Sequence, residues 1–234
     1  MHFITIIYNT ILNALFPLSK SEEELFAMNE ETAFESLPEA PSVPIEAFSV
    51  FAYKDEKVSK LIWNIKYKKS EKAIKIASYA LFKKIQKILS NMFLDENVLP
   101  SKIILLPIPI SKRRRRERGF NQCELLLQEI ERLQNNASIR NDKFILHFNH
   151  KLLIRGKHSS RQTLKHRQER LKDAKDIFSV DYEEFENVIK EVQLENVLFI
   201  IIDDVITTGS TMLDAVKVLR EVGAQKIIPL SVAH

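Results

Sequence analysis

One segment constrains this chain more than any other: an unbroken apolar run, Val197–Ile202, that ends at two adjacent acids, Asp203 and Asp204. The run is short and rich in β-branched residues, which is typical of a strand buried on both faces of a parallel sheet. Polar groups that follow such a strand lie at the edge where open α/β sheets bind ligands. The segment therefore predicts an α/β fold with two carboxylates at a ligand-binding edge.

A hydroxyl-rich turn follows the acids, and a helix follows the turn. Apolar residues recur at helical spacing from Met212 to Val222, and Gly223 stands where a helix C-cap belongs. The turn thus precedes a helix N-terminus, where unpaired N–H groups and the helix dipole favour an anion. Glycine in the turn would let the backbone approach a phosphate closely. The candidate phosphate-binding residues are Thr207, Thr208, Gly209, Ser210 and Thr211.

The stretch from Ile201 to Thr211 resembles the phosphoribosyl pyrophosphate (PRPP) motif of type I phosphoribosyltransferases. The resemblance implies that Asp203 and Asp204 hold the ribose hydroxyls and act in catalysis by electrostatic stabilisation. It also implies that the turn anchors the 5-phosphate. Mg²⁺ would arrive bound to the pyrophosphate oxygens, since it prefers few carboxylates together with substrate phosphates. The alternative is an ordinary strand-to-helix turn with capping hydroxyls.

Further segments are similar to the ComF/GntX family of competence-related proteins. Leu105–Gln122 resembles the family's strand with Pro-x-Pro, its basic run and its Arg-Gly-Phe-Asn-Gln; Leu152–Thr163 and Lys66–Lys68 resemble two other elements. The resemblance covers roughly residues 47–234. It implies a type I phosphoribosyltransferase-like domain over that range, with a mostly parallel sheet flanked by helices. It also implies a link to DNA uptake, with single-stranded DNA and competence proteins as partners.

The basic run Lys112–Arg118 has six bases and one acid. Because it follows a predicted strand, we expect it on a loop at the ligand edge. Three interpretations stay open: pyrophosphate binding, with Arg118 as the candidate, nucleic-acid contact, or a solvated charged face. The candidate nucleic-acid contacts are Lys112, Arg113, Arg114, Arg115 and Arg116. Arg161 and Gln162 fall where the family has a flexible loop that could close over pyrophosphate; exposed loop residues are the alternative.

Residues 1–46 are interpreted as an N-terminal helix and an acidic, proline-containing linker, or as structure completed by a partner. The family often carries a zinc module here, but no cysteine pairs follow Leu15–Lys20, so no structural zinc is expected. The apolar Met1–Phe16 is too short for a membrane span. Docking on the domain, on a second copy in a homodimer, or on a partner is expected instead, and a weak association with a membrane surface is the alternative.

The single cysteine, Cys123, suits a reducing cytoplasm and is expected to be buried. His147 and His150 are interpreted as surface residues rather than metal ligands. Strands and helices are expected to alternate, which favours a parallel sheet. The expected strands are 47–53, 102–108, 152–155, 197–202 and 226–232, and the expected helices are 58–67, 71–89, 121–133, 163–172 and 211–222.

Two classes of function remain. The first is a PRPP-dependent transferase whose acceptor the sequence does not name. The second is a non-catalytic PRPP-sensing or single-stranded-DNA-handling protein on a transferase fold. The fold alone does not choose between them.

Overall fold

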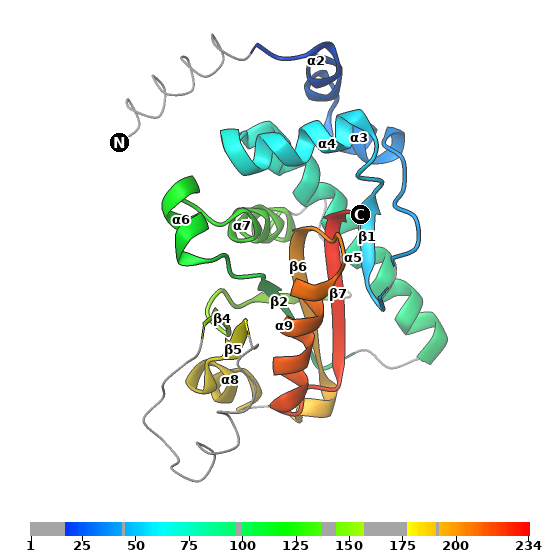
Figure 1. Cartoon of the computed structure of the whole chain (residues 1–234). Helices are drawn as coiled ribbons and strands as arrows, with labels where there is room; N and C mark the ends of the chain where they lie inside the picture. Colours follow the sequence, from blue (N-terminus) through cyan, green and yellow to red (C-terminus); the bar gives the residue numbers. More distant parts are fainter. Residues whose placement is uncertain (1–16, 44, 97–99, 137–143, 157–176, 191) are drawn as a thin grey trace.

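A computed structural model of the chain describes residues 17–43, 45–96, 100–136, 144–156, 177–190 and 192–234. A five-stranded sheet forms its centre, with the strand order β1-β7-β6-β2-β3 and every neighbouring pair parallel (Figure 1). The strands are β1 (Phe48–Phe51), β2 (Lys102–Pro107), β3 (Leu146–Phe148), β6 (Val197–Val205) and β7 (Lys226–Ala233). The expected α/β fold with a parallel sheet is confirmed, and it is consistent with a phosphoribosyltransferase-like fold.

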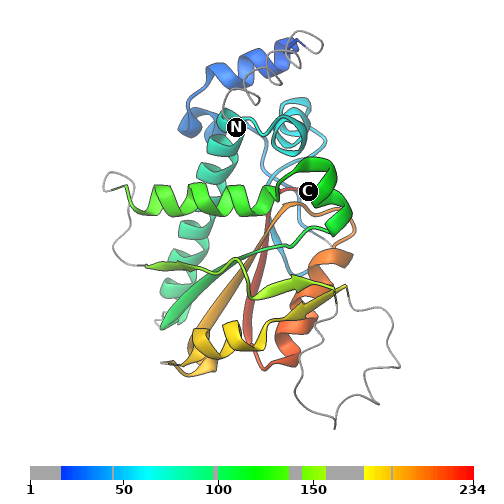
Figure 2. The ribbon, with the colours of Figure 1, turned by 90° about the vertical axis from the view of Figure 1, so that its left-hand side faces the viewer.

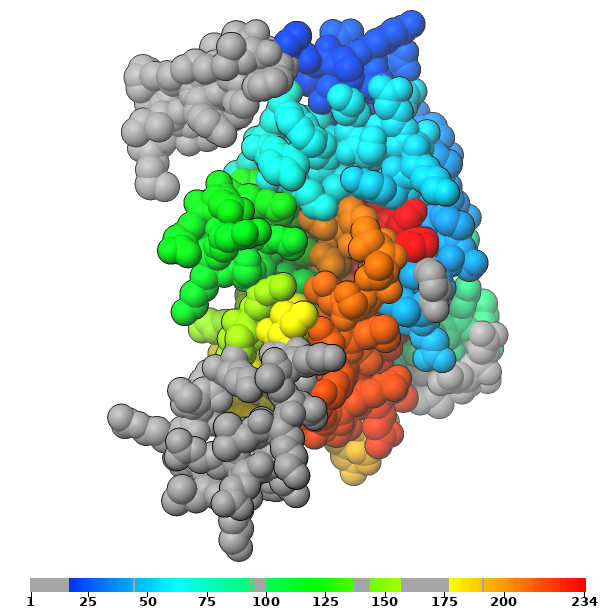
Figure 3. All heavy atoms as spheres, viewed as in Figure 1, coloured from blue at the N-terminus to red at the C-terminus, as the bar shows by residue number. Residues whose placement is uncertain are grey.

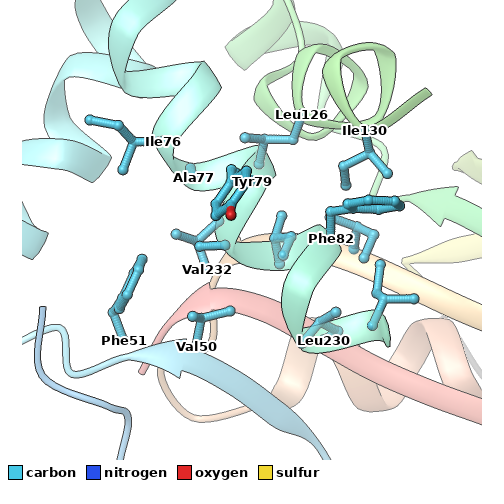
Figure 4. Close-up of a cluster of buried hydrophobic side chains, with 14 of the residues drawn as sticks. Val50, Phe51, Ile76, Ala77, Tyr79, Phe82, Leu126, Ile130, Leu230 and Val232 are labelled. Carbon is cyan, nitrogen blue, oxygen red and sulfur yellow. The ribbon is translucent and has the colours of Figure 1, made fainter. Parts of the chain in front are cut away.

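The central strand β6 is apolar on both faces because both faces of the sheet are covered. Leu198, Ile200 and Ile202 join one core, whereas Phe199 and Ile201 join the other, as the two-residue period of a strand requires. The helices α5 (Glu71–Glu96) and α7 (Gln122–Gln134) cover the first face, and α8 (Tyr182–Ile189) and α9 (Ser210–Glu221) cover the second. Figure 4 shows side chains of α5 and α7 packed over β1 and β7 in the first core.

Three short helices and a π-helical turn lie at the end of the sheet where β7 ends (Figure 1). They are α2 (Lys20–Ala27), α3 (Glu30–Ser36), α4 (Glu56–Trp63) and the π-helical turn η1 (Asn64–Lys68). The linker interpretation was therefore wrong for residues 20–36. Local caps at Ser19 and Asn29 start α2 and α3, and Leu25 and Ala33 are fully buried in the first core. These two helices need few apolar residues to pack on the domain, because neighbouring helices bury the ones they have.

The basic run forms a helix, α6 (Lys112–Arg118), and not the expected loop. The side chain of Ser111 caps its N-terminus by accepting from the Arg114 amide, and Gly119 ends it with a φ of 79°. Two polar cap residues thus define a helix that no apolar periodicity could reveal, because none of its residues is buried.

The strand expected near 152–155 is present as β4 (Leu153–Arg155), but it lies outside the main sheet. It pairs antiparallel with β5 (Phe178–Val180), which the sequence did not predict. Neither β3, α8 nor the 3₁₀ turn η2 (Leu194–Asn196) was predicted. The helix expected at 163–172 lies outside the described residues. Among the helices that are described, none combines the length and hydrophobicity required to cross a bilayer.

Candidate functional site

The acid pair lies at the carboxyl end of the central strand. β6 runs through Asp203 and Asp204 to Val205, beyond the predicted end at residue 202, whereas its neighbour β2 stops opposite Ile202. By the alternation of the strand, Asp203 faces the α8–α9 side and Asp204 faces the α5–α7 side. The two carboxylates are therefore close in sequence but enter different surroundings.

Asp203 lies against Cys123, which is in the first turn of α7 but, unlike the other buried apolar residues of that helix, belongs to the second core. The Asp203 Oδ1 atom accepts the backbone N–H of Asp204 at 2.8 Å and lies 3.6 Å from the Cys123 Sγ. Burial, together with the charge of Asp204, raises the pKa of Asp203 to about 7. Burial also raises the pKa of the Cys123 thiol, which stays protonated and donates to the carboxylate. The buried cysteine was expected; its contact with Asp203 was not.

Asp204 is held by a lysine from the π-helical turn. The Lys66 Nζ lies 3.2 Å from the Asp204 Oδ1, and both side chains are largely buried. Asn64 stabilises this turn by donating to the Lys60 carbonyl at 2.9 Å and to the Glu22 carboxylate at 2.6 Å. A π-helical turn often marks a functional site. The sequence pointed to Lys66 only through the Lys-Tyr-Lys resemblance, which assigned it no role.

The hydroxyl-rich turn adjoins Asp203, as predicted. Asp203 and residues 205–212 line one hollow of about 30 Å³, roughly the volume of one water molecule in the liquid. The Thr208 Oγ1 lies 3.2 Å from the Ser210 Oγ at the rim and accepts the Ser210 amide in a long contact of 3.5 Å. The N-cap residue of α9 is Gly209, which makes no side-chain cap. The first amides of α9 therefore lack intrahelical acceptors. Because the hollow is small, a sugar phosphate would rest on its rim rather than inside it.

Gly209 has a structural role that the sequence did not reveal. Its φ is 80°, and a Cβ at this position would lie 2.8 Å from the Ile45 Cδ1. Gly209 is buried beneath this isoleucine, which packs against the second core. The left-handed backbone and the close isoleucine together explain the glycine; close approach of a phosphate stays a prediction.

Besides Lys66, basic side chains from two elements, β4 and α6, lie near this edge of the sheet. Arg155 of β4 donates to the Pro109 carbonyl at 3.3 Å and lies over the Phe178 ring. Burial lowers the pKa of Arg155; the nearby Arg114 lowers it further, whereas Asp203 opposes the shift. The Arg118 guanidinium lies 5.4 Å from the Tyr67 ring centroid. These contacts bring β4, α6 and η1 around the same edge of the sheet.

The remaining arginines of α6 differ in their contacts. Arg115 makes a two-point contact with Glu124, at 2.9 and 3.3 Å, and Arg113 pairs with Glu117 at 3.4 Å. Lys112, Arg114 and Arg116 are exposed. Figure 2, turned by 90° from Figure 1, also places α6 (green) beside the orange turn after β6 and the cyan segment that ends in η1. Arg161 and Gln162 lie outside the described residues.

The five-stranded parallel sheet flanked by helices is consistent with a phosphoribosyltransferase-like fold. No family model matches the chain. The chain is 32% identical over 129 residues to Competence protein F of Haemophilus influenzae, and 33% identical over 127 residues to Competence protein ComFC of Bacillus subtilis. These matches support a ComF-family assignment and confirm the resemblance found in the sequence.

The matched stretches are 55% and 54% of this chain but 48% and 42% of the two relatives. The chain thus spans about half the length of the curated relatives it matches, or less.

Proposed function

We propose that this ComF-like protein binds PRPP at the carboxyl end of β6. The observation that carries the proposal is that Asp203 and the hydroxyl-rich turn of residues 207–211 line one hollow beside the N-terminus of α9. The first amides of that helix, which have no intrahelical acceptors, and the hydroxyls of the turn suit the 5-phosphate. The carboxylates at the strand end suit the ribose hydroxyls, which can donate hydrogen bonds to them.

The surrounding cations suit the pyrophosphate. Lys66 pairs with Asp204, Arg155 lies close enough to Asp203 for the two charges to interact, and Arg118 lies over Tyr67, the neighbour of Lys66 in η1. Guanidinium groups bind phosphate oxygens in bidentate fashion. The two carboxylates also fit Mg²⁺ that arrives bound to PRPP. They are too few to coordinate the ion by themselves, and one of them is already paired with Lys66. When bound, Mg²⁺ would neutralise charge on the pyrophosphate.

For a transferase reaction, this chain's residues would act by positioning and by charge. The turn would hold the phosphate remote from the reacting carbon and so fix that carbon in place. The acid pair would favour positive charge that develops on the ribose carbon as pyrophosphate leaves. A PRPP-sensing role would need the same binding residues but no release of pyrophosphate.

The names of the two relatives support a role in competence, and hence in DNA uptake. One observation favours direct contact with single-stranded DNA as a second candidate function: α6 has no buried residue and exposes Lys112, Arg114 and Arg116. Exposed bases on one short helix can neutralise backbone phosphates without reading the sequence.

Calorimetric titration with PRPP and Mg²⁺ tests the binding proposal. We expect Asp204→Asn to weaken binding about tenfold or more, because it removes the charge that a ribosyl ligand and its Mg²⁺ would meet. Glu221→Gln, an exposed acid at the far end of α9, is the matched control and should bind as the unmodified chain does. No heat of binding with the unmodified chain would refute the proposal. Release of pyrophosphate with an acceptor panel then separates transferase from sensor.

A further inference from the structure

A second cavity adjoins the acid pair. It has a volume of about 610 Å³ and is lined by residues of α2, α4 and η1, together with Pro17, Ser19 and Tyr53. Its size falls in the range of ~300–1,000 Å³ typical of small-molecule sites. Lys66 lines this cavity and also pairs with Asp204 at 3.2 Å. The cavity and the candidate PRPP site therefore share one side chain.

Exposed aromatic rings form one side of this cavity. Trp63 and Tyr67 lie four residues apart, with ring centroids 5.6 Å apart and an interplanar angle of 45°. Trp63 is 38% exposed and Tyr67 is 52% exposed; Tyr53 is 40% exposed. Figure 3 shows the cyan segment that carries these residues on the same face as the green α6 and the orange turn. The Lys68 Nζ lies over the Trp63 ring, 5.2 Å from its centroid, and Arg118 lies over the Tyr67 ring. A flat ring would therefore stack on the exposed part of these aromatics, beside the two cations.

The charge of the lining favours an anion. Among the described residues, the lining contains Lys60, Lys66 and Lys68 and one acid, Glu22, so its net charge is +2. Lys60 lies 3.8 Å from Glu22, and Lys66 pairs with Asp204, which is outside the lining, so an anion would meet two lysines that already have acidic neighbours. Burial would raise the pKa of Glu22, but hydrogen bonds from Ser19 and Asn64 lower it below its usual value. Glu22 is 5% exposed and already accepts from the Ser19 amide at 2.9 Å and from Asn64 at 2.6 Å. Its acceptor capacity is therefore used within the protein.

We propose that this cavity binds a small planar aromatic anion, of the class of a pyridine carboxylate. The ring would stack on Trp63 and Tyr67, and the carboxylate would face Lys60 and Lys66. Binding at this cavity goes beyond the proposed function and does not depend on it. One further point does rest on the proposed function. If PRPP binds at the acid pair, the aromatic anion would lie beside its ribose, because Lys66 lines the cavity and pairs with Asp204.

The chain offers its own reporter for this site. Trp63 is the single tryptophan, so its fluorescence reports the cavity directly. We would titrate the full chain with nicotinate and, separately, with nicotinamide, which has the same ring but no charge. Nicotinate should quench Trp63 and bind at least about fivefold more tightly than nicotinamide, and added salt should reduce this preference. Lys66→Met should reduce it as well.

Variants read by calorimetry separate stacking from charge. Trp63→Ala should weaken nicotinate binding about tenfold, whereas Trp63→Phe should keep most of the affinity. Tyr182→Ala, which removes a tyrosine of α8 that is 48% exposed, is the matched control and should change nothing. Circular dichroism of each variant checks that the fold is kept.

Three results would overturn the proposal: equal affinity for nicotinate and nicotinamide, unchanged nicotinate affinity in Trp63→Ala, or quenching by oligothymidylate but not by nicotinate. The last would assign this face to single-stranded nucleic acid. A PRPP titration on the same sample keeps the two proposals apart. Nicotinate binding without PRPP binding would refute only the proposed function, and PRPP binding without nicotinate binding would refute only the cavity's ligand.

Discussion

The acid pair and the basic helix α6 lie at the same edge of the sheet, yet they are built in different ways. Asp203 and Asp204 belong to a strand bonded on both sides, and each carboxylate has a partner from a distant part of the chain, Cys123 or Lys66. The helix α6 has no buried residue. The first region can therefore depend on exact geometry and shifted pKa values, whereas the second offers mainly a field of exposed charge.

The largest effect should come from the pH dependence of stability. Because the pKa of Asp203 is raised from 3.8 to about 7, the folded chain keeps a proton between roughly pH 4 and 7 that the unfolded chain releases. The free energy of unfolding should therefore fall as pH rises through this window, by about 2–3 kcal/mol between pH 5 and 8. Urea denaturation at each pH measures it.

Asp203→Asn provides the control for this prediction, because its side chain does not titrate. The difference between the two chains removes the contributions of other groups, including His147, whose pKa burial lowers. If the two chains show the same pH dependence, Asp203 is not buried in the protonated form. No charge change within α6 should produce such a pH dependence, since none of its residues is buried.

Gly209, beside the acid pair, and Gly119, at the end of α6, have nearly the same φ, so substituting each of them compares the two regions directly. Gly209→Ala should lower the free energy of unfolding by about 2–3 kcal/mol, because the new Cβ meets Ile45 at 2.8 Å in a left-handed backbone. Gly119→Ala at the end of α6, where a Cβ meets nothing within 4 Å, should cost only about 1 kcal/mol. Adding Ile45→Ala to Gly209→Ala should recover part of the stability lost in Gly209→Ala, because it removes the side chain that the new Cβ meets. Equal costs at both glycines would contradict the role given to Ile45.

The exposed arginines of α6 should act on nucleic-acid binding and not on stability. The double variant Arg114→Ala/Arg116→Ala should weaken binding of single-stranded DNA severalfold and reduce the slope of log affinity against log salt by about 1.4, or about 0.7 for each lost phosphate contact. The free energy of unfolding should change by less than about 0.5 kcal/mol. Fluorescence anisotropy over a salt series measures both affinity and slope. Arg220→Ala, at the end of α9, is the control; an equal effect there would remove α6 from the interface.

The smallest effect is expected within α6 itself. Arg115→Ala removes the two-point contact with Glu124 and should lower the free energy of unfolding by up to about 1 kcal/mol. Arg113→Ala removes a more exposed pair with Glu117 and should cost less than about 0.5 kcal/mol. Thermal unfolding of the two variants, side by side, tests the order. A larger loss at Arg113 would show that exposure does not set the value of these pairs.

The sequence predicted those parts of the fold whose local pattern reports burial. The continuous apolar run of Val197–Ile202 predicted a strand covered on both faces, and the chain places β6 between β7 and β2. The helical spacing after the turn predicted α9 almost to its ends, Ser210 and Glu221. By contrast, α6 has only its caps as a signal, and α2 and α3 carry few apolar residues, so periodicity could not identify them.

By itself, the sequence determined that this chain forms a parallel sheet with two acids and a hydroxyl-rich turn at one edge. The burial of a strand and the start of a helix both depend on neighbouring residues, so a local pattern can predict them. Only the tertiary structure decided what each acid meets. The pairing of Asp204 with Lys66, the contact of Asp203 with Cys123 and the cover of Ile45 over Gly209 join segments that are far apart in the chain. Such contacts follow from how helices pack over the sheet, which no local pattern records.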